Sequence, residues 1–104
     1  MNAVKNKVYE PFTIADLWHS YQIQLNLSGE GIPYINKGDK VVLKSKEELK
    51  ELETSDIVLN YAGCLFTVTG IMKIDDDLYG WVVNDGQRDF TLYDSDIETV
   101  YKEI

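Results

Sequence analysis

The sequence has 104 residues with a formal net charge of −8, of which 44% are hydrophobic and 27% charged. This length and composition are typical of one folded domain, and the excess of acids argues against a general binder of nucleic-acid backbones. One cysteine and one histidine exclude an internal disulfide and a metal site built on several of either residue. No apolar run approaches the roughly 20 residues of a membrane span, and no apolar signal-peptide segment opens the chain.

We therefore expect a single domain over residues 1–104 in the cytoplasm, with no cofactor, no metal and no membrane partner. Residues 1–7 are polar and are expected to be loose. Nearly all basic residues are lysine, and amino acids with AT-rich codons are abundant. This usage favours an origin in a phage, a plasmid or an AT-rich bacterial genome.

The excess negative charge lies entirely in one half of the chain. Residues 1–52 contain seven lysines and seven acids, whereas residues 53–104 contain eleven acids and three basic residues. The densest acids are Asp75, Asp76, Asp77, Asp85, Asp89, Asp94 and Asp96. They form either a solvated surface or an electronegative face for a basic partner.

The N-terminal third predicts mixed structure. Residues 8–12 are predicted to be extended because Pro11 disfavours a helical residue before it. Thr13, followed by Asp16, resembles a capping box, and the apolar spacing up to Tyr21 predicts a short helix. Strict alternation over residues 21–27 then predicts a half-buried strand, so we expect a helix and a strand over about 13–27.

The middle of the chain predicts a turn at 37–40 and a strand at 41–44. Ser45 and Glu48 are placed to cap a short helix, with Leu49 and Leu52 on its inward face. The apolar segment 57–59 fits either a strand or a buried loop.

The last forty residues predict strands at 64–73, 79–83, 88–93 and 97–101. Asn84-Asp85-Gly86 is a strong hairpin signal, because Asn and Gly tolerate positive φ. Asp94-Ser95-Asp96 fits a one-turn helix. The expected core residues are Phe66, Val68, Phe90 and Leu92, with Val82 or Trp81. Met72 is expected on the same face of its strand as Phe66 and Val68.

This order of a first strand at 38–43, a long loop, a three-stranded meander, a one-turn helix and a last strand at 97–100 resembles a small SH3-like barrel over residues 37–102. The Ala-Leu-Tyr-Asp-Tyr run and Trp-Trp pair of signalling SH3 domains are absent, so recognition of proline-rich peptides is not implied. The chain is also similar to a PUA-like barrel, which would include the helix and strand at 13–27. That class commonly binds RNA or modified bases.

Both resemblances imply a mainly β fold of the α+β class. We expect a small, strongly bent antiparallel barrel with SH3-like or PUA-like topology and one or two short helices.

Binding residues are expected among the aromatics, because tyrosine and tryptophan suit interfaces. The candidates beside the barrel loops are Tyr61, Tyr79, Trp81 and Tyr93, together with the acids Asp75, Asp76 and Asp77. The alternative RNA-facing residues are Lys37, Lys40, Lys44, Lys46 and Lys50.

No catalytic constellation is evident. His19 has no nucleophile at a recognisable spacing, and Cys64 is expected to be a small buried apolar residue. The consecutive acids 75–77 lack the alternation and the glycine of a calcium loop and are expected to form a turn. The sequence therefore favours a non-catalytic binding or regulatory module for a protein partner. The alternatives are an RNA-binding regulator that uses the N-terminal half, and an acidic nucleic-acid mimic that inhibits a nucleic-acid-binding protein.

Overall fold

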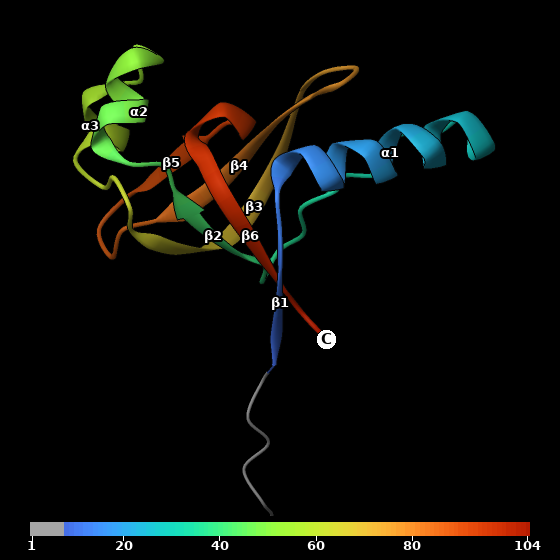
Figure 1. The fold of residues 1–104 in the computed structure, drawn as a ribbon, viewed down its shortest axis with the longest axis horizontal. Coiled ribbons are helices and arrows are strands. Elements are labelled where there is room, and N and C mark those ends of the chain that lie inside the picture. Colours follow the sequence, from blue (N-terminus) through green and yellow to red (C-terminus); the bar gives the residue numbers. More distant parts are fainter. Residues whose placement is uncertain (1–7) are drawn as a thin grey trace, which may run out of the picture.

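A six-stranded antiparallel sheet is the framework of the computed structural model, which describes residues 8–104 (Figure 1). The strands are β1 (Tyr9–Phe12), β2 (Lys40–Leu43), β3 (Leu65–Asp75), β4 (Leu78–Asn84), β5 (Asp89–Leu92) and β6 (Ile97–Glu103). The helices are α1 (Ile14–Ser28), α2 (Lys46–Glu51) and α3 (Asp56–Leu59), with a 3₁₀ turn η1 (Asp94–Asp96). The α+β class is confirmed, and the expectation for residues 1–7 lies outside the described residues.

The strands follow the order β1-β6-β2-β3-β4-β5. The long strand β3 joins two parts of the sheet: its start pairs with β2, and its remainder pairs with β4. The register shifts between Val68 and Gly70, where the two parts meet. Within residues 8–104, β1 and β5 are edge strands that do not pair with each other, so the sheet does not close into the expected barrel.

The N-terminal helix is twice as long as expected, and the strand predicted at 21–27 is wrong. Helix α1 runs through this segment to Ser28 and ends at Gly29, which has φ 74° and donates its N–H to the carbonyl of Leu25. Leu17 and Tyr21 are buried and Leu25 is partly buried, so the core contacts keep a spacing of four residues. The predicted start is confirmed, because the Thr13 side chain accepts the N–H of Asp16.

Two short helices lie together at one end of the sheet (Figure 1). Ser45 caps α2 as expected by accepting the N–H of Glu48, and Leu49 is fully buried. Leu52, expected on the inward face, is instead 45% exposed because α2 ends before it. The segment 57–59 is neither a strand nor a loop, since it belongs to helix α3.

The C-terminal strands and turns match their predictions closely. Gly86 has φ 101° and donates its N–H to the side chain of Asn84, which closes the β4–β5 hairpin. The one-turn helix at 94–96 is the 3₁₀ turn η1. Residues 32–36 form no strand, although Tyr34 and Ile35 are buried.

The core differs from the expected set at several positions. Val68, Trp81 and Leu92 are fully buried. Phe66 and Phe90 are only partly buried, and with Tyr61 they form a separate aromatic cluster with ring centroids 5.2–5.4 Å apart. The register shift in β3 turns Met72 outward, where it is 49% exposed, and Val82 is only partly buried on the same outward side. Cys64, expected to be buried, is exposed.

Candidate binding surface

Two of the four predicted binding aromatics belong to the core. Tyr79 is 2% exposed and Trp81 is fully buried, and their rings stack at 5.4 Å. Tyr21 and Tyr34 pack edge-on against them. Sequence reasoning placed Tyr79 and Trp81 beside loops, but both side chains point to the inner side of the sheet and offer no surface to a partner.

Asp94 satisfies the polar atoms of this aromatic cluster. Its carboxylate accepts the indole N–H of Trp81 at 2.8 Å and the hydroxyl of Tyr34. Burial, followed by the hydrogen bond to Asp94, raises the pKa of Tyr34. The tyrosine therefore stays a neutral donor, and Asp94 has a structural role.

The acidic β3–β4 turn is partly anchored to α1. The hydroxyl of Tyr21 donates to Asp77 at 3.2 Å, and burial, then Tyr79 and Asp77, raises the pKa of Tyr21. Asp75 accepts the N–H of Asp76 at 2.8 Å, which supports the predicted turn. All three acids are exposed, but Asp77 also fixes the turn in place.

Tyr61 likewise has a structural partner. Its hydroxyl donates to Asp85 at 2.7 Å, and its ring stacks on Phe90. This hydrogen bond, together with the backbone N–H groups of Arg88 and Gln87, lowers the pKa of Asp85 to about 2. Asp85 thus holds the β4–β5 turn against the segment between α3 and β3.

The remaining predicted aromatic, Tyr93, belongs to an exposed sheet surface that we name the outer sheet face. This face is the side of β3, β4 and β5 that points away from the core, continued by Tyr93 directly after β5. Its side chains are Met72, Ile74, Leu78, Val82, Thr91 and Tyr93. Met72 lies opposite Gly80 and Val82 opposite Thr91 in the strand ladders, so these residues share one side. Met72, Ile74, Leu78 and Tyr93 are each between 42% and 49% exposed.

Gly80 allows side chains of β3 and β5 to approach each other closely on the outer sheet face. A Cβ atom there would lie 2.6 Å from the methyl group of Thr91 and 3.2 Å from Ile74. The hydroxyl of Thr91 also approaches the sulfur of Met72 at 3.9 Å. The absence of a side chain at Gly80 therefore lets three neighbouring strands present one continuous apolar surface.

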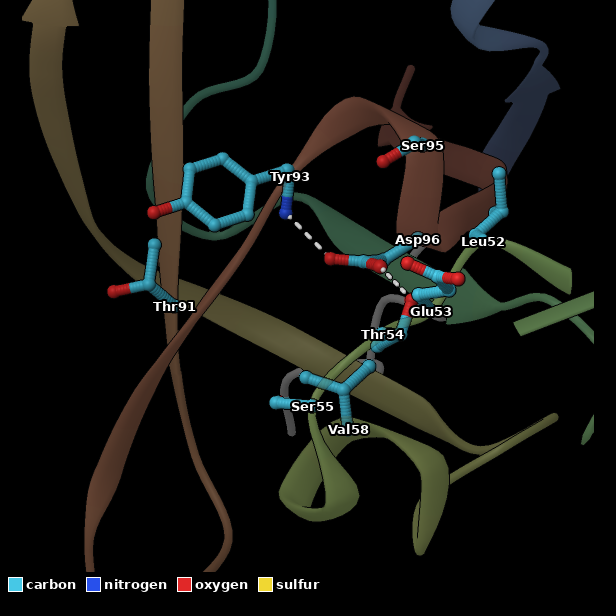
Figure 2. A pocket seen from close by; sticks show the side chains of 9 residues that line it. All are labelled: Leu52, Glu53, Thr54, Ser55, Val58, Thr91, Tyr93, Ser95 and Asp96. Atoms are coloured by element: carbon cyan, nitrogen blue, oxygen red, sulfur yellow. Dashed lines mark hydrogen bonds between the residues drawn. The ribbon is translucent and has the colours of Figure 1, made fainter. Parts of the chain in front are cut away.

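A pocket of about 280 Å³ adjoins this surface (Figure 2). Its lining residues are Leu52, Glu53, Thr54, Ser55, Val58, Thr91, Tyr93, Ser95 and Asp96. Asp96 is buried and satisfied, because it accepts the N–H of Tyr93 and the hydroxyl of Thr54, each at 3.0 Å. Thr91 and Tyr93 belong to both the pocket and the outer sheet face, which makes the two regions continuous.

Sequence reasoning missed Ile74, Leu78 and the pocket. The pocket requires the α2–α3 turn to meet η1 across many intervening residues, which no local pattern encodes. The sequence did contain a signal for the exposure of Met72, because Gly70 lies at the register shift and a glycine within a strand often marks such an irregularity.

The surroundings of this surface are acidic. Glu53 at the pocket, Asp89 on β5, and Asp75 and Asp76 at the turn are all exposed. Within the described residues two ion pairs form, Arg88–Asp85 and Lys102–Asp39. These pairs use two of the three cations in residues 53–104, so most of the negative charge there is uncompensated.

The five lysines expected to face RNA in the alternative hypothesis lie towards both ends of β2. Lys37 and Lys40 precede or begin β2, whereas Lys44, Lys46 and Lys50 follow its end. Lys40 and Lys44 are about 13 Å apart at the rise of an extended strand. Lys40 donates to Thr67 at 2.7 Å and lies over the ring of Tyr9. None of the five forms an ion pair with a described acid.

His19 lies exposed on α1 and Cys64 lies exposed before β3. Residues 8–104 contain no cluster of three or more His, Cys, Asp or Glu side chains arranged to hold a metal ion. No helix in the same residues combines the length and the apolar character needed to cross a membrane.

The chain matches no protein-family model, and no curated protein or solved structure matches it significantly.

Proposed function

We propose that this protein is a non-catalytic binding or regulatory module whose outer sheet face captures a protein partner. The observation that carries the proposal is the continuous apolar surface of Met72, Ile74 and Leu78, which runs through Thr91 into the pocket. Exposed apolar side chains grouped on one face, beside a concave pocket, are typical of interaction sites.

The negative charge around the outer sheet face favours a basic partner. Asp75 and Asp76 lie at one end and Glu53 lies at the pocket, with little basic charge among them. A partner segment with apolar side chains between lysines or arginines would match both features. The acids would speed its association, and the apolar contacts would provide most of the affinity.

The arrangement from β2 to β6 supports an SH3-like topology over a PUA-like one. The β2 strand pairs with both β3 and β6, the β3–β4–β5 meander follows, and η1 precedes β6. Under this proposal α1 and β1 are additions to an SH3-like core.

We also propose that the protein is cytoplasmic, because an exposed free thiol at Cys64 suits a reducing compartment.

Selection from a displayed library of 12-residue peptides would test the proposal. We expect the enriched peptides to be basic and apolar, and their affinity to fall as salt rises. Met72→Ser should weaken a selected peptide by about fivefold or more, the effect of a residue at the centre of an interface. Leu65→Ser is the matched control, because Leu65 is similarly exposed but lies outside the outer sheet face.

The alternatives predict different results. Enrichment of neutral or acidic peptides, or equal effects of Met72→Ser and Leu65→Ser, would contradict the proposal. Salt-dependent binding of a labelled single-stranded RNA that is lost in Lys40→Glu/Lys44→Glu would favour the RNA-binding regulator instead. Competition with DNA for a nucleic-acid-binding protein, weakened by Asp75→Asn/Asp76→Asn, would favour the acidic mimic.

A further inference from the structure

The edge strand β5 has backbone groups that face away from its neighbour. In the β4–β5 hairpin the N–H of Asp85 donates to the carbonyl of Arg88 at 3.2 Å. Antiparallel strands alternate between residues whose N–H and C=O face the paired strand and residues whose groups face away from it. Counting from Arg88, the backbone groups of Phe90 face β4, whereas those of Asp89 and Thr91 point to the free side of the sheet.

A second contact supports this assignment. The hydroxyl of Thr69 donates to the carbonyl of Val82 at 3.2 Å, so the backbone groups of Val82 face β3. Val82 lies opposite Thr91 in the ladder, and Thr91 therefore has no backbone partner on β4. In residues 8–104 no turn or loop hydrogen bond uses the backbone N–H or carbonyl of Thr91 or Asp89.

No other element covers this free side. Strand β5 is the last in the sheet order, and among residues 8–104 no helix or strand except β4 lies along it. The open stretch ends at Tyr93, whose N–H and carbonyl both bond to Asp96. Thr91 and Tyr93 also line the pocket of Figure 2, so space for further side chains adjoins the edge. The opposite edge strand, β1, contains Pro11, which has no N–H to offer.

The charges beside the free edge of β5 favour a basic segment. Asp89 shares the outer sheet face with Thr91, because residues two apart in a strand point to the same side. Glu53 lines the adjoining pocket, and no lysine or arginine does. Arg88, at the start of β5, lies 3.7 Å from the carboxylate of Asp85. An added segment would therefore meet uncompensated acids.

We propose that a segment of the protein partner adds to β5 as an antiparallel strand, which rests on the proposed function for the basic and apolar character of that segment. One partner residue exchanges two backbone hydrogen bonds with Thr91, and the residue two positions later exchanges two with Asp89. Directly opposite residues share one face of a sheet. An apolar residue opposite Thr91, followed two positions later by a lysine or arginine opposite Asp89, therefore matches the edge.

A seven-residue peptide, acetyl-Lys-Leu-Thr-Val-Thr-Lys-Thr-amide, is the probe, with its valine opposite Thr91 and its second lysine opposite Asp89. NMR titration of the full chain with up to about 2 mM peptide should give a dissociation constant below about 1 mM. The peptide at about 2 mM should then slow hydrogen exchange of the Thr91 N–H by about threefold or more, because a paired amide exchanges only from the free protein. The N–H of Phe90, already paired with β4, should change much less.

Methylation of single peptide amides tests the backbone pairing. N-methylation of the valine removes the N–H that donates to Thr91 and should weaken binding by about tenfold or more. N-methylation of the threonine that follows is the matched control, because its N–H points away from β5 and the affinity should stay within about twofold. Equal effects of the two methyl groups, or unchanged exchange at Thr91, would overturn strand addition.

A charge exchange tests the register. Asp89→Lys should weaken the probe by about threefold or more, and replacing the second lysine of the peptide with glutamate should restore binding to this variant. Asp76→Lys changes the net charge equally at the β3–β4 turn and should show no such preference for the glutamate peptide. An equal preference in both variants would reflect net charge alone and overturn the proposal.

The probe also separates strand addition from the proposed function. Met72 lies on β3, three strand spacings or about 14 Å from the added strand, so Met72→Ser should leave binding of the probe within about twofold. If library peptides bind through Met72 but the probe leaves exchange at Thr91 unchanged, strand addition fails and the proposed function stands. If the probe protects Thr91 but no peptide depends on Met72, the proposed function fails and the edge of β5 stands as a binding site.

Discussion

The indole N–H of Trp81 donates to the carboxylate of Asp94 at 2.8 Å, and the hydroxyl of Tyr34 donates to the other oxygen of that carboxylate. One side chain thus joins β4, η1 and the segment after α1. Since both donors are in the core, loss of Asp94 leaves two polar groups without partners.

We expect Asp94→Ala to lower the free energy of unfolding by about 2–4 kcal/mol, because each unsatisfied buried group costs about 1–3 kcal/mol. Urea denaturation followed by tryptophan fluorescence measures this loss. Asp89→Ala removes an exposed carboxylate on the adjacent strand and should change stability by less than about 0.5 kcal/mol. Similar effects of the two substitutions would mean that Asp94 does not organise the core.

Gly80 should not tolerate a side chain. A Cβ atom would lie 2.6 Å from the methyl group of Thr91, so Gly80→Ala should destabilise the protein by about 1–3 kcal/mol through overpacking. Gly70→Ala is the control, because its nearest contact would be an ordinary 3.4 Å to Val82. Thermal unfolding of both variants provides the comparison.

The clash at Gly80 also predicts a rescue. Thr91→Ser removes the methyl group and should recover part of the stability lost in Gly80→Ala. The double-mutant cycle should therefore show a favourable coupling of about 0.5 kcal/mol or more. Strict additivity would indicate that the backbone of β4 moves instead.

Local chemistry was sufficient to predict most turns and caps. Thr13, Ser45 and Gly86 carry their structural roles in their own side chains or in their lack of one. The side chains of Thr13 and Ser45 each accept the N–H of the residue three positions later. Gly86 adopts a positive φ and donates its N–H to Asn84, two positions earlier. For this reason the C-terminal hairpins and the 3₁₀ turn were predictable without knowledge of the tertiary fold.

The segment 21–27 shows why the alternating pattern failed. Its odd-numbered apolar residues fit a strand, but Tyr21 and Leu25 also continue the four-residue spacing that starts at Leu17. Ile23 and Leu27 face solvent on the opposite side. A pattern that counts every apolar residue as buried cannot identify such a helix, and it also cannot reveal an exposed apolar surface.

The candidate site was predictable only in part. The acids 75–77 and Tyr93 were expected at a surface and are exposed. Tyr79 and Trp81 were assigned to that surface because tyrosine and tryptophan favour both interfaces and cores. Only the strand register, set by long-range pairing of β3 with β4, separates the two roles.

Glu53 is the only described residue other than glycine with a positive φ, 53°, and it lines the pocket. The left-handed region costs about 1–2 kcal/mol for a residue with a Cβ atom. We expect Glu53→Gly to stabilise the protein by about 0.5–1 kcal/mol, after allowing for the greater freedom of glycine in the unfolded chain. Glu51→Gly at the end of α2, where the backbone is helical, should have the opposite sign.

Asp85 should make stability depend on pH in the acid range. Its pKa is lowered to about 2 in the folded protein, first by the hydroxyl of Tyr61 and then by backbone N–H groups, whereas aspartate in an unfolded chain titrates near about 3.9. A lowered folded pKa means that the stabilisation is complete above the unfolded pKa and is lost as pH falls from about 4 towards about 2.

Carbon-detected NMR titration of the Asp85 carboxyl group should find a midpoint near 2. In Tyr61→Phe the largest cause of the shift is removed, so the midpoint should move up towards the ordinary value and the loss of stability between pH about 4 and about 2 should become shallower. Tyr93→Phe is the control, because it removes the hydroxyl of an exposed tyrosine elsewhere and should leave the Asp85 midpoint unchanged. An unchanged Asp85 midpoint in Tyr61→Phe would assign the lowered pKa to the backbone N–H groups of the turn rather than to the tyrosine.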